Sequence, residues 1–403
     1  MKPVLNKKNG VHEPRTVETG LERLLKDPPS HLRRASLGLV ANQASVGPKL
    51  NHAIQLIDQA LPGRLKTIFS PQHGFAGEKQ DNMVESDHGR ESSTGRMIFS
   101  LYGRTRRPEP EMLANLDVLI IDLADVGTRV YTFAQTMTYC LEEAARTGLK
   151  VMVLDRPNPI GGIQVEGNLL KPDCASFVGL SPLPMRHGLT MGELAGYIAR
   201  RLNPAPDFEV VRLAGWSREM YYDQTGLYWV MPSPNMPASG TALVYPGQVI
   251  WEGTNISEGR GTTRPFHLCG APFIDSKQFK AELEGYDLPG VYFRAAAFEP
   301  TFHKYRAEVC HGLEVHPADR LRYQPYLTSL TMLEVLLRLY PDQVAWKAPP
   351  YEYERERCPL DLILGDRRIR EGLEKGMSAA DLAREWQPEL SSFLEERKKY
   401  LLY

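Results

Sequence analysis

Long apolar runs and an excess of charge of either sign are both missing from this chain of 403 residues. A helix that crosses a membrane needs about 20 consecutive apolar residues, and no segment comes near that length. Basic residues number 48 and acidic residues 49, which leaves a net charge of −1. This balance argues against a nucleic acid or a membrane surface as partner. The first residues hold no apolar stretch of signal-peptide length, so we expect a cytoplasmic protein, or a periplasmic or secreted one if a leader has been removed.

Cysteine is scarce, and the motifs of several common enzyme classes are absent. The five cysteines are far apart and form no C-x-x-C pair, so we expect reduced, packed thiols instead of disulfides or a zinc site. The sequence contains no G-x-G-x-x-G or G-x-x-x-x-G-K-[ST] loop for a dinucleotide or a nucleoside triphosphate. It also lacks the G-x-S-x-G elbow of serine hydrolases and the H-E-x-x-H motif of zinc proteases. The sequence therefore argues against all four of these enzyme classes.

Buried strands alternate with helices in the first half of the chain. The apolar runs are continuous, which is typical of strands covered on both faces in a parallel sheet. Helical patterns between them, such as 51–61 and 132–147, predict a Rossmann-like, doubly wound layer. The four predicted strands are Ser36–Ala41, Leu65–Phe69, Asp117–Leu123 and Leu149–Leu154.

Each predicted strand is followed by a cluster of polar residues. Ligands bind at the carboxyl ends of the strands in open α/β sheets, so these clusters predict a binding site at that edge. The clusters span 42–43, 70–74, 122–129 and 155–158.

The second half of the chain has a different pattern of predicted helices and strands. Thr190-Met-Gly-Glu193 is a capping box and predicts a helix over 190–202. We predict a Rossmann-like parallel-sheet domain over 1–240 and a smaller α/β (α+β) domain over 241–403. The expected order is a turn-rich segment 231–272, helix 276–284, strands 291–298 and 307–315, helix 326–340 and two tail helices, the first opening at Ser378.

Carboxylates gather in glycine-rich loops. Glycoside hydrolysis needs two carboxyl groups at the scissile bond, one of them kept protonated by apolar surroundings. Glu166 lies between Val165 and Gly167 and suits a general acid with a raised pKa. Glu85 or Glu78, in the loop after the second strand, would act as base or nucleophile.

Several long motifs resemble the exo-β-N-acetylmuramidase family of glycoside hydrolases, long known as a domain of unknown function. Agreement extends from near residue 35 to the C-terminus and is densest over 125–266. The matching segments are LGLVANQ (37–43), SPQHGF (70–75), SLYG (100–103), DVGTRVYTF (125–133), LDRPNPIGG (154–162), VEGN (165–168), PMRHGLTMGELA (184–195), PSPNMP (232–237) and WEGTNISEGRGTTRPF (251–266).

This resemblance implies an active-site cleft between the two domains, where N-acetylmuramic acid is removed from the non-reducing end of peptidoglycan fragments. It implies that no metal or organic cofactor takes part and that the partner is a small saccharide or muropeptide. Family catalysis is attributed to two glutamates, which on this chain are Glu166 and Glu85, with Glu78 competing for the role of Glu85. Relatives commonly have glutamate where this chain has Gln72, which implies an altered substrate or weak activity if that residue transfers a proton.

The leading hypothesis is therefore an exo-acting glycosidase of cell-wall turnover or recycling, with Glu166 as acid and Glu85 as base or nucleophile. An arginine fork, Arg129 or Arg260, would bind the lactyl carboxylate of the sugar. A non-catalytic muropeptide-binding protein is the alternative, and a sugar transferase is disfavoured by the missing phosphate loop. The further predicted substrate-binding residues are Gln72, His73, Glu78, Tyr131, Asp155, Asn158, His187, Asn235, Glu252, Asn255 and Glu258.

Overall fold

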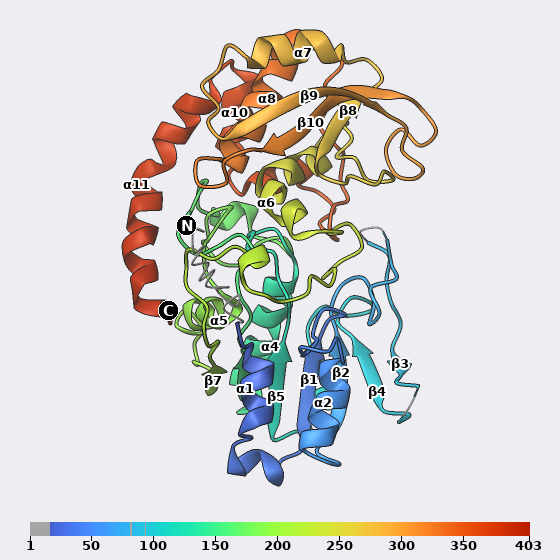
Figure 1. The fold of residues 1–403 in the computed structure, drawn as a ribbon, viewed down its shortest axis with the longest axis vertical. Coiled ribbons are helices and arrows are strands. Elements are labelled where there is room, and N and C mark those ends of the chain that lie inside the picture. Colours follow the sequence, from blue (N-terminus) through green and yellow to red (C-terminus); the bar gives the residue numbers. More distant parts are fainter. Residues whose placement is uncertain (1–16, 81–82, 93) are drawn as a thin grey trace, which may run out of the picture.

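The computed structural model describes residues 17–80, 83–92 and 94–403, which form two domains, one above the other in Figure 1. The N-terminal domain is built on a seven-stranded sheet and the C-terminal domain on a three-stranded sheet. The predicted class, a Rossmann-like α/β domain followed by a smaller α/β domain, is confirmed. The proposed boundary at residue 240 falls at the start of helix α6 (Ser239–Gln248).

The large sheet consists of β1 (Leu37–Ala41), β2 (Leu65–Ser70), β3 (Gly89–Arg90), β4 (Met97–Ser100), β5 (Val118–Asp122), β6 (Lys150–Leu154) and β7 (Phe208–Val211). Its order is β3-β4-β2-β1-β5-β6-β7, and every pair is parallel except β3 with β4. The four strands predicted from continuous apolar runs are all present. The strands β4 and β7 were missed because they lie toward the edges and are largely half-buried, so they lack such a run.

Helices cover both faces of this sheet. Helices α1 (Gly20–Lys26) and α2 (Ala53–Ala60) pack on one face and share an apolar cluster with β1. Helices α4 (Phe133–Thr147) and α5 (Met191–Ala199) pack on the other face, and the short α3 (Pro110–Leu113) precedes β5. The predicted capping box is confirmed at the start of α5.

The C-terminal domain combines an antiparallel sheet with helices packed on it. Its elements after α6 are β8 (Leu268–Ala271), α7 (Ser276–Leu283), β9 (Val291–Phe298), β10 (Cys310–Pro317), α8 (Pro325–Leu339), α9 (Pro359–Leu364), α10 (Arg367–Glu374) and α11 (Ala379–Arg397). The sheet order is β8-β10-β9.

Helix α6 lies within the segment that was predicted to be turn-rich, and its composition explains the error. Pro246 and Gly247 lie inside the helix and disguise its pattern. Gly247 is required because α6 passes very close to α8. A Cβ at this position would lie 1.9 Å from the carbonyl oxygen of Pro325.

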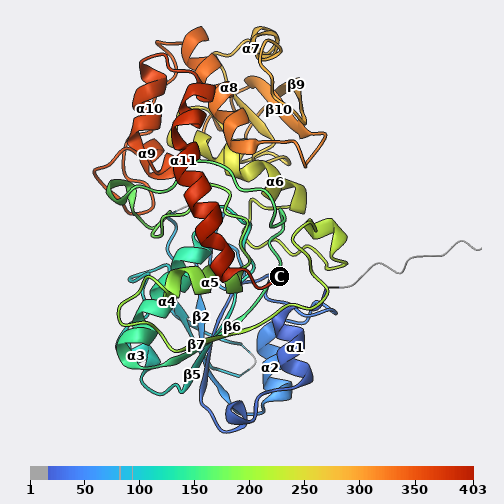
Figure 2. The same cartoon turned by 90° about the vertical axis from the view of Figure 1, so that its left-hand side faces the viewer.

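Helix α11 is one continuous helix, so the prediction of two tail helices beginning at Ser378 was wrong. Ser378 does cap the helix, but the internal Pro388 does not end it. The helix begins in the C-terminal domain and extends back along the N-terminal domain (Figure 2). There Nη1 of Arg397 donates to the carbonyl oxygen of Gly162 at 3.0 Å.

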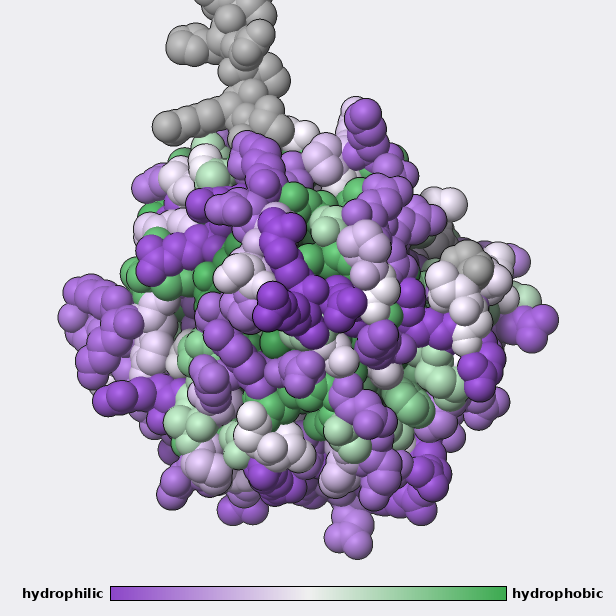
Figure 3. Space-filling view, turned by 90° about the horizontal axis from the view of Figure 1, so that it is seen from below, coloured by the Kyte–Doolittle hydropathy of each residue, from purple (hydrophilic) through white to green (hydrophobic). Residues whose placement is uncertain are grey.

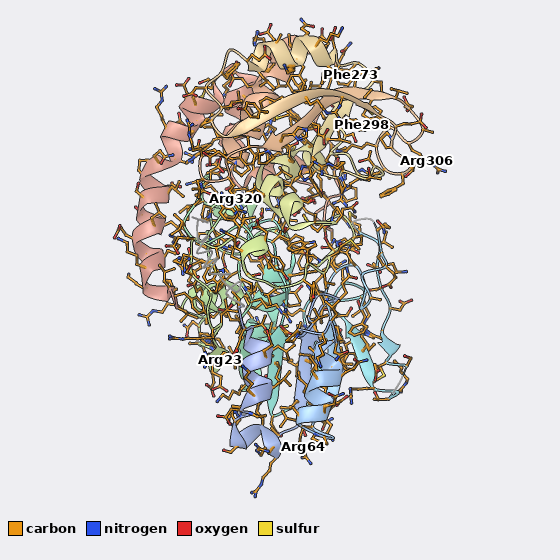
Figure 4. The ribbon with its side chains drawn as sticks, viewed as in Figure 1. Arg23, Arg64, Phe273, Phe298, Arg306 and Arg320 are labelled. Carbon is orange, nitrogen blue, oxygen red and sulfur yellow. The ribbon has the colours of Figure 1, made fainter. Side chains whose placement is uncertain are left out.

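One of the apolar clusters extends through both domains. Leu119 of β5 and Leu330 of α8 belong to the same cluster of buried side chains. At the edge of this contact Arg320 pairs with Asp223 at 2.7 Å, and Figure 4 labels Arg320 where the two domains meet. Burial of this apolar surface fixes the position of one domain relative to the other.

The surface is mixed in polarity, and the cysteines are unpaired. Seen from the end of the N-terminal domain, polar and apolar side chains are interspersed (Figure 3). All five cysteines are free, as predicted, and four of them are buried. In the described part of the chain, no helix has both the length and the apolar character needed to cross a membrane.

Arg129 ties loops of the two domains together. It is 1% exposed. Its Nη1 donates to the carbonyl oxygens of Asn168 and Leu183 at 2.8 and 2.9 Å. Its Nη2 donates to those of Ile363 and Leu364 at 3.0 and 2.7 Å. One guanidinium therefore satisfies four buried carbonyl groups from distant parts of the chain.

We expect Arg129→Met to destabilise the protein by on the order of 3 kcal/mol or more, because it leaves several buried carbonyl groups without a donor. Chemical denaturation would measure the free energy of unfolding. The matched control is Arg146→Met, since the Arg146 side chain is 64% exposed and its loss should change stability by less than about 0.5 kcal/mol. Equal effects of the two substitutions would contradict the role given to Arg129.

Candidate active site

A pocket lies between the two domains. We call it the interdomain pocket. Both domains supply its walls, which combine polar side chains with aromatic and aliphatic ones. The lining residues are Gln72, His73, Val130, Tyr131, Thr132, Phe133, Val178, Ser233, Asn235 and Met236 from the N-terminal domain, and Tyr245, Glu252, Arg260, Phe266, Tyr351 and Glu352 from the C-terminal domain.

The loop after β2 brings two of these residues to the pocket. Gln72 and His73 follow the strand, and His73 and Gly74 have φ of 77° and 82°, which turn the chain sharply. Nδ1 of His73 lies 2.8 Å from the carbonyl oxygen of Lys79. Because a carbonyl oxygen can only accept, Nδ1 carries the proton and donates this hydrogen bond. The Nδ2 of Asn235 donates to the carbonyl oxygen of Gln80 at 3.1 Å and holds this loop against the pocket.

Glu352 is a buried carboxyl group at the pocket wall. Its Oε1 accepts a hydrogen bond from Nε2 of Gln72 at 3.0 Å, and its Oε2 accepts one from the hydroxyl of Tyr102 at 2.5 Å. Burial raises the pKa of Glu352 to about 7, because these two hydrogen bonds offset only part of the cost of removing the charge from water. Glu352 is therefore about half protonated at neutral pH.

Glu252 is the second buried carboxyl group of the pocket, and its environment lowers its pKa. Its Oε1 accepts from Nη2 of Arg260 at 2.6 Å, and its Oε2 accepts from the hydroxyl of Tyr351 at 2.7 Å. Burial is the largest influence and raises the pKa of Glu252, but the positive charge of Arg260, together with the hydrogen bonds from Arg260 and Tyr351, outweighs burial and the pKa is lowered. Glu252 is therefore ionised.

Charges behind Arg260 complete the network. The Nε of Arg260 lies 3.2 Å from Oε1 of Glu258, and Nζ of Lys304 lies 2.9 Å from Oε2 of the same residue. Lys304 also donates to the carbonyl oxygens of Trp251 and Ile256. The two buried glutamates, Glu252 and Glu258, thus face two cations, the buried Arg260 and the half-buried Lys304.

Gln72 acts as a hydrogen-bond donor toward Glu352. Its Nε2 donates to both Glu352 and the hydroxyl of Tyr102, each at 3.0 Å, and its Oε1 accepts from the hydroxyl of Thr132. A glutamate at this position would instead place a second carboxyl group beside Glu352.

Six residues that were predicted to bind substrate line the interdomain pocket, and a seventh contacts one of them. The six are Gln72, His73, Tyr131, Asn235, Glu252 and Arg260, and the seventh is Glu258.

Five predicted substrate-binding residues have structural partners outside the pocket lining. Arg129 binds the four carbonyl groups described above. The other four make hydrogen bonds to backbone groups of neighbouring loops and are Asp155, Asn158, His187 and Asn255.

The three glutamates favoured from sequence do not line the pocket. Oε1 of Glu166 accepts from the backbone N–H of Leu327 at 2.8 Å, in the first turn of α8, and burial raises the pKa of Glu166 to about 7. The raised pKa is as expected, but the carboxyl group joins the two domains. The Glu85 side chain is 54% exposed and lies 3.6 Å from Arg106. Glu78 is exposed beside Gly74.

Sequence reasoning missed Glu352, Tyr102 and Tyr351. Tyr102 belongs to the SLYG motif but was given no role. The only signal for Glu352 is its place between two tyrosines after two prolines, in a segment crowded with other charges. Its partner Gln72 lies 280 residues earlier, so no local pattern connects them.

A metal site is not evident. Within the residues that the structure describes, no three side chains of His, Cys, Asp or Glu are grouped so as to hold a metal ion.

Comparison with protein-family models matches almost the whole described chain. Residues 37–240 match the model "Exo-beta-N-acetylmuramidase NamZ, N-terminal" and residues 243–403 match "Exo-beta-N-acetylmuramidase NamZ, C-terminal". The chain is 40% identical over 396 residues to the peptidoglycan beta-N-acetylmuramidase NamZ of Bacillus subtilis (strain 168), covering 98% of this chain and 94% of that protein.

Two crystal structures of DUF1343 family proteins from Bacteroides fragilis NCTC 9343 are similar to this one. The first has a TM-score of 0.88 and 32% sequence identity, and the alignment covers 96% of this chain and 99% of that chain. The second has a TM-score of 0.74 and 26% identity with the same coverage.

The raised pKa of Glu352 predicts a pH-dependent cost to stability. The folded state binds this proton more tightly than the unfolded state, whose glutamate pKa is 4.5, so stability falls as the pH rises from about 4.5 to about 7. We expect the free energy of unfolding of Glu352→Gln to decrease over this pH range by on the order of 2 kcal/mol less than that of the wild type. Denaturation at pH 5 and pH 8 would measure it, with Glu85→Gln as control. Identical pH dependence in the wild type and Glu352→Gln would contradict a raised pKa.

Proposed function

Because the chain belongs to the exo-β-N-acetylmuramidase NamZ family, we propose that the interdomain pocket is its active site, with Glu352 as general acid and Glu252 as the second carboxylate. The predicted activity itself is confirmed by the family match: the protein is a glycoside hydrolase that removes terminal N-acetylmuramic acid from the non-reducing end of peptidoglycan fragments.

The observation that supports this assignment is a pair of buried carboxyl groups in one pocket whose pKa values are shifted in opposite directions. Glu352 keeps its proton to about pH 7, and Glu252 is ionised by Arg260. Glycoside hydrolysis requires one protonated and one ionised carboxyl group at the scissile bond. Environments that separate two pKa values in this way assign the acid and base roles.

Each group then has a defined step. Glu352 gives its proton to the glycosidic oxygen as the bond to the anomeric carbon breaks. The negative charge of Glu252 stabilises the positive charge that develops on the sugar ring, and the carboxylate attacks the anomeric carbon or activates a water molecule. Arg260 and Tyr351 hold Glu252 in place, so little reorganisation accompanies the reaction.

Four substitutions separate this pair from the pair favoured by the sequence. We expect Glu352→Gln and Glu252→Gln each to lower kcat by roughly 10²–10⁴-fold, the usual contribution of a catalytic acid or base. Glu166→Gln and Glu85→Gln should lower kcat by less than about tenfold, because neither side chain lines the pocket. Release of N-acetylmuramic acid from the disaccharide MurNAc-GlcNAc would be measured, with GlcNAc-MurNAc as the substrate control. If Glu166→Gln is folded but inactive while Glu352→Gln keeps its activity, the catalytic acid is Glu166 and not Glu352.

The pH dependence of turnover gives a second test. Activity should fall above about pH 7, where Glu352 loses its proton. Gln72→Glu adds a negative charge 3.0 Å from Glu352 and should move this alkaline limb to higher pH. Gln224→Glu, which adds the same charge at an exposed site, is the matched control. An alkaline limb that is unchanged in Gln72→Glu would show that Glu352 is not the titrating acid.

A further inference from the structure

A second cavity lies in the N-terminal domain, at the same edge of the large sheet as the interdomain pocket. Its volume is about 180 Å³, and a single water molecule needs only roughly 10–15 Å³. The start of helix α1, the loop after β1, Arg156 and residues between 222 and 228 form its walls, so we call it the α1 cavity. Among the described residues it shares no lining residue with the interdomain pocket. The α1 cavity therefore has room for a small organic molecule of its own.

The α1 cavity lies where the order of the sheet reverses. Strand β1 has β2 on one side and β5 on the other, and open α/β sheets bind ligands at the carboxyl ends of such a pair of strands. Arg156 joins the two sides of this point. Its Nε and Nη2 donate to the carboxylate of Asp122, at the end of β5, at 2.5 and 2.9 Å. Its Nη2 also donates to the carbonyl oxygen of Val46, in the loop after β1, at 3.2 Å.

One nitrogen of Arg156 is left for a ligand. The Arg156 side chain is 7% exposed. Its Nη1 nevertheless keeps contact with solvent, and it donates to no acceptor within residues 17–80, 83–92 and 94–403. Both other nitrogens are occupied, so Arg156 cannot bind a carboxylate through two parallel hydrogen bonds. Nη1 therefore suits a single oxygen acceptor, such as a hydroxyl or a carbonyl group.

The α1 cavity also presents an acceptor and an aromatic ring. Oε2 of Glu22 accepts from the backbone N–H and the hydroxyl of Thr19 at 2.8 and 2.9 Å. Oε1 of Glu22 is in contact with solvent and accepts no hydrogen bond from the described part of the chain. Tyr228 is 67% exposed and offers the apolar face of its ring. A hydroxyl group both accepts and donates, so neighbouring hydroxyls can bond to Arg156 and Glu22, whereas a carbonyl group can only accept.

The charges around the α1 cavity disfavour an anion. Asp122 and Glu22 are two carboxylates, and Arg156 is the one cation that lines the cavity. An anionic ligand would lie near both carboxylates and would reach only one nitrogen of the guanidinium. An uncharged ligand that carries several hydroxyl groups meets no such repulsion.

We propose that the α1 cavity binds an uncharged sugar unit, whose ring packs on Tyr228 and whose hydroxyls bond to Nη1 of Arg156 and Oε1 of Glu22. In peptidoglycan the uncharged sugar is N-acetylglucosamine, whereas N-acetylmuramic acid carries the lactyl carboxylate. The α1 cavity thus favours the neutral sugar of the substrate over the sugar that the enzyme releases. This site uses no residue of the proposed catalytic pair.

Calorimetry of N-acetylglucosamine with the full-length protein tests this proposal. Tyr228→Ala should weaken binding by roughly 3- to 10-fold, because it removes the aromatic contact. Glu22→Gln should weaken binding by roughly tenfold, because its oxygen still caps Thr19 and its amide nitrogen cannot accept from the sugar. Tyr292→Ala is the matched control, since Tyr292 is a tyrosine of β9 that is 72% exposed, and it should leave binding unchanged.

Three results would overturn the proposal: no binding of N-acetylglucosamine that depends on Tyr228, an equal loss in Tyr292→Ala, or a dipeptide such as alanyl-alanine that binds in its place with the same dependence on Tyr228. Tyr228→Ala should leave kcat for MurNAc-GlcNAc unchanged, because Tyr228 does not line the interdomain pocket. Binding in the α1 cavity and catalysis by Glu352 are measured separately, so either proposal can fail without the other.

Discussion

The interdomain contact is the constraint on which the rest of this structure depends. An apolar core shared by both domains brings them together, and the buried guanidinium of Arg129 satisfies carbonyl groups from loops on either side of the contact. Walls from both domains then enclose the interdomain pocket, and its carboxyl groups are separated from water as a result. Glu166 adds to the same contact, because a carboxyl group of one domain accepts from the first turn of α8 in the other.

Burial acts on the two pocket glutamates in the same direction, and their neighbours make the difference. Removal from water favours the neutral form of both Glu352 and Glu252. Glu352 has only neutral hydrogen-bond donors, Gln72 and Tyr102, which recover a part of that cost. Glu252 faces Arg260, and the positive charge of Arg260 acts together with the hydrogen bonds that Arg260 and Tyr351 donate to lower the pKa. One neutral and one charged partner thus produce an acid and a base from the same side chain.

Much of the N-terminal sheet could be predicted because its strands follow from local patterns of apolar residues. The central strands are continuous apolar runs, and Gln72 and His73 lie at the carboxyl end of one of them, where open α/β sheets bind ligands. Glu352 escaped prediction because its role comes from partners that are distant in sequence. Arg129 and Glu166 were predicted to belong to the active site for a related reason. Polar residues in glycine-rich loops indicate a ligand, yet here the groups they bind are backbone atoms of the other domain.

Helix α11 returns the chain to the N-terminal domain. The chain enters the C-terminal domain at α6 and leaves it through α11, so this domain is joined to the N-terminal domain both at α6 and through the docked end of α11 (Figure 2). A body held at two separated points has less freedom to rotate than a body held by one linker. The second attachment therefore limits how far the two walls of the interdomain pocket can move apart.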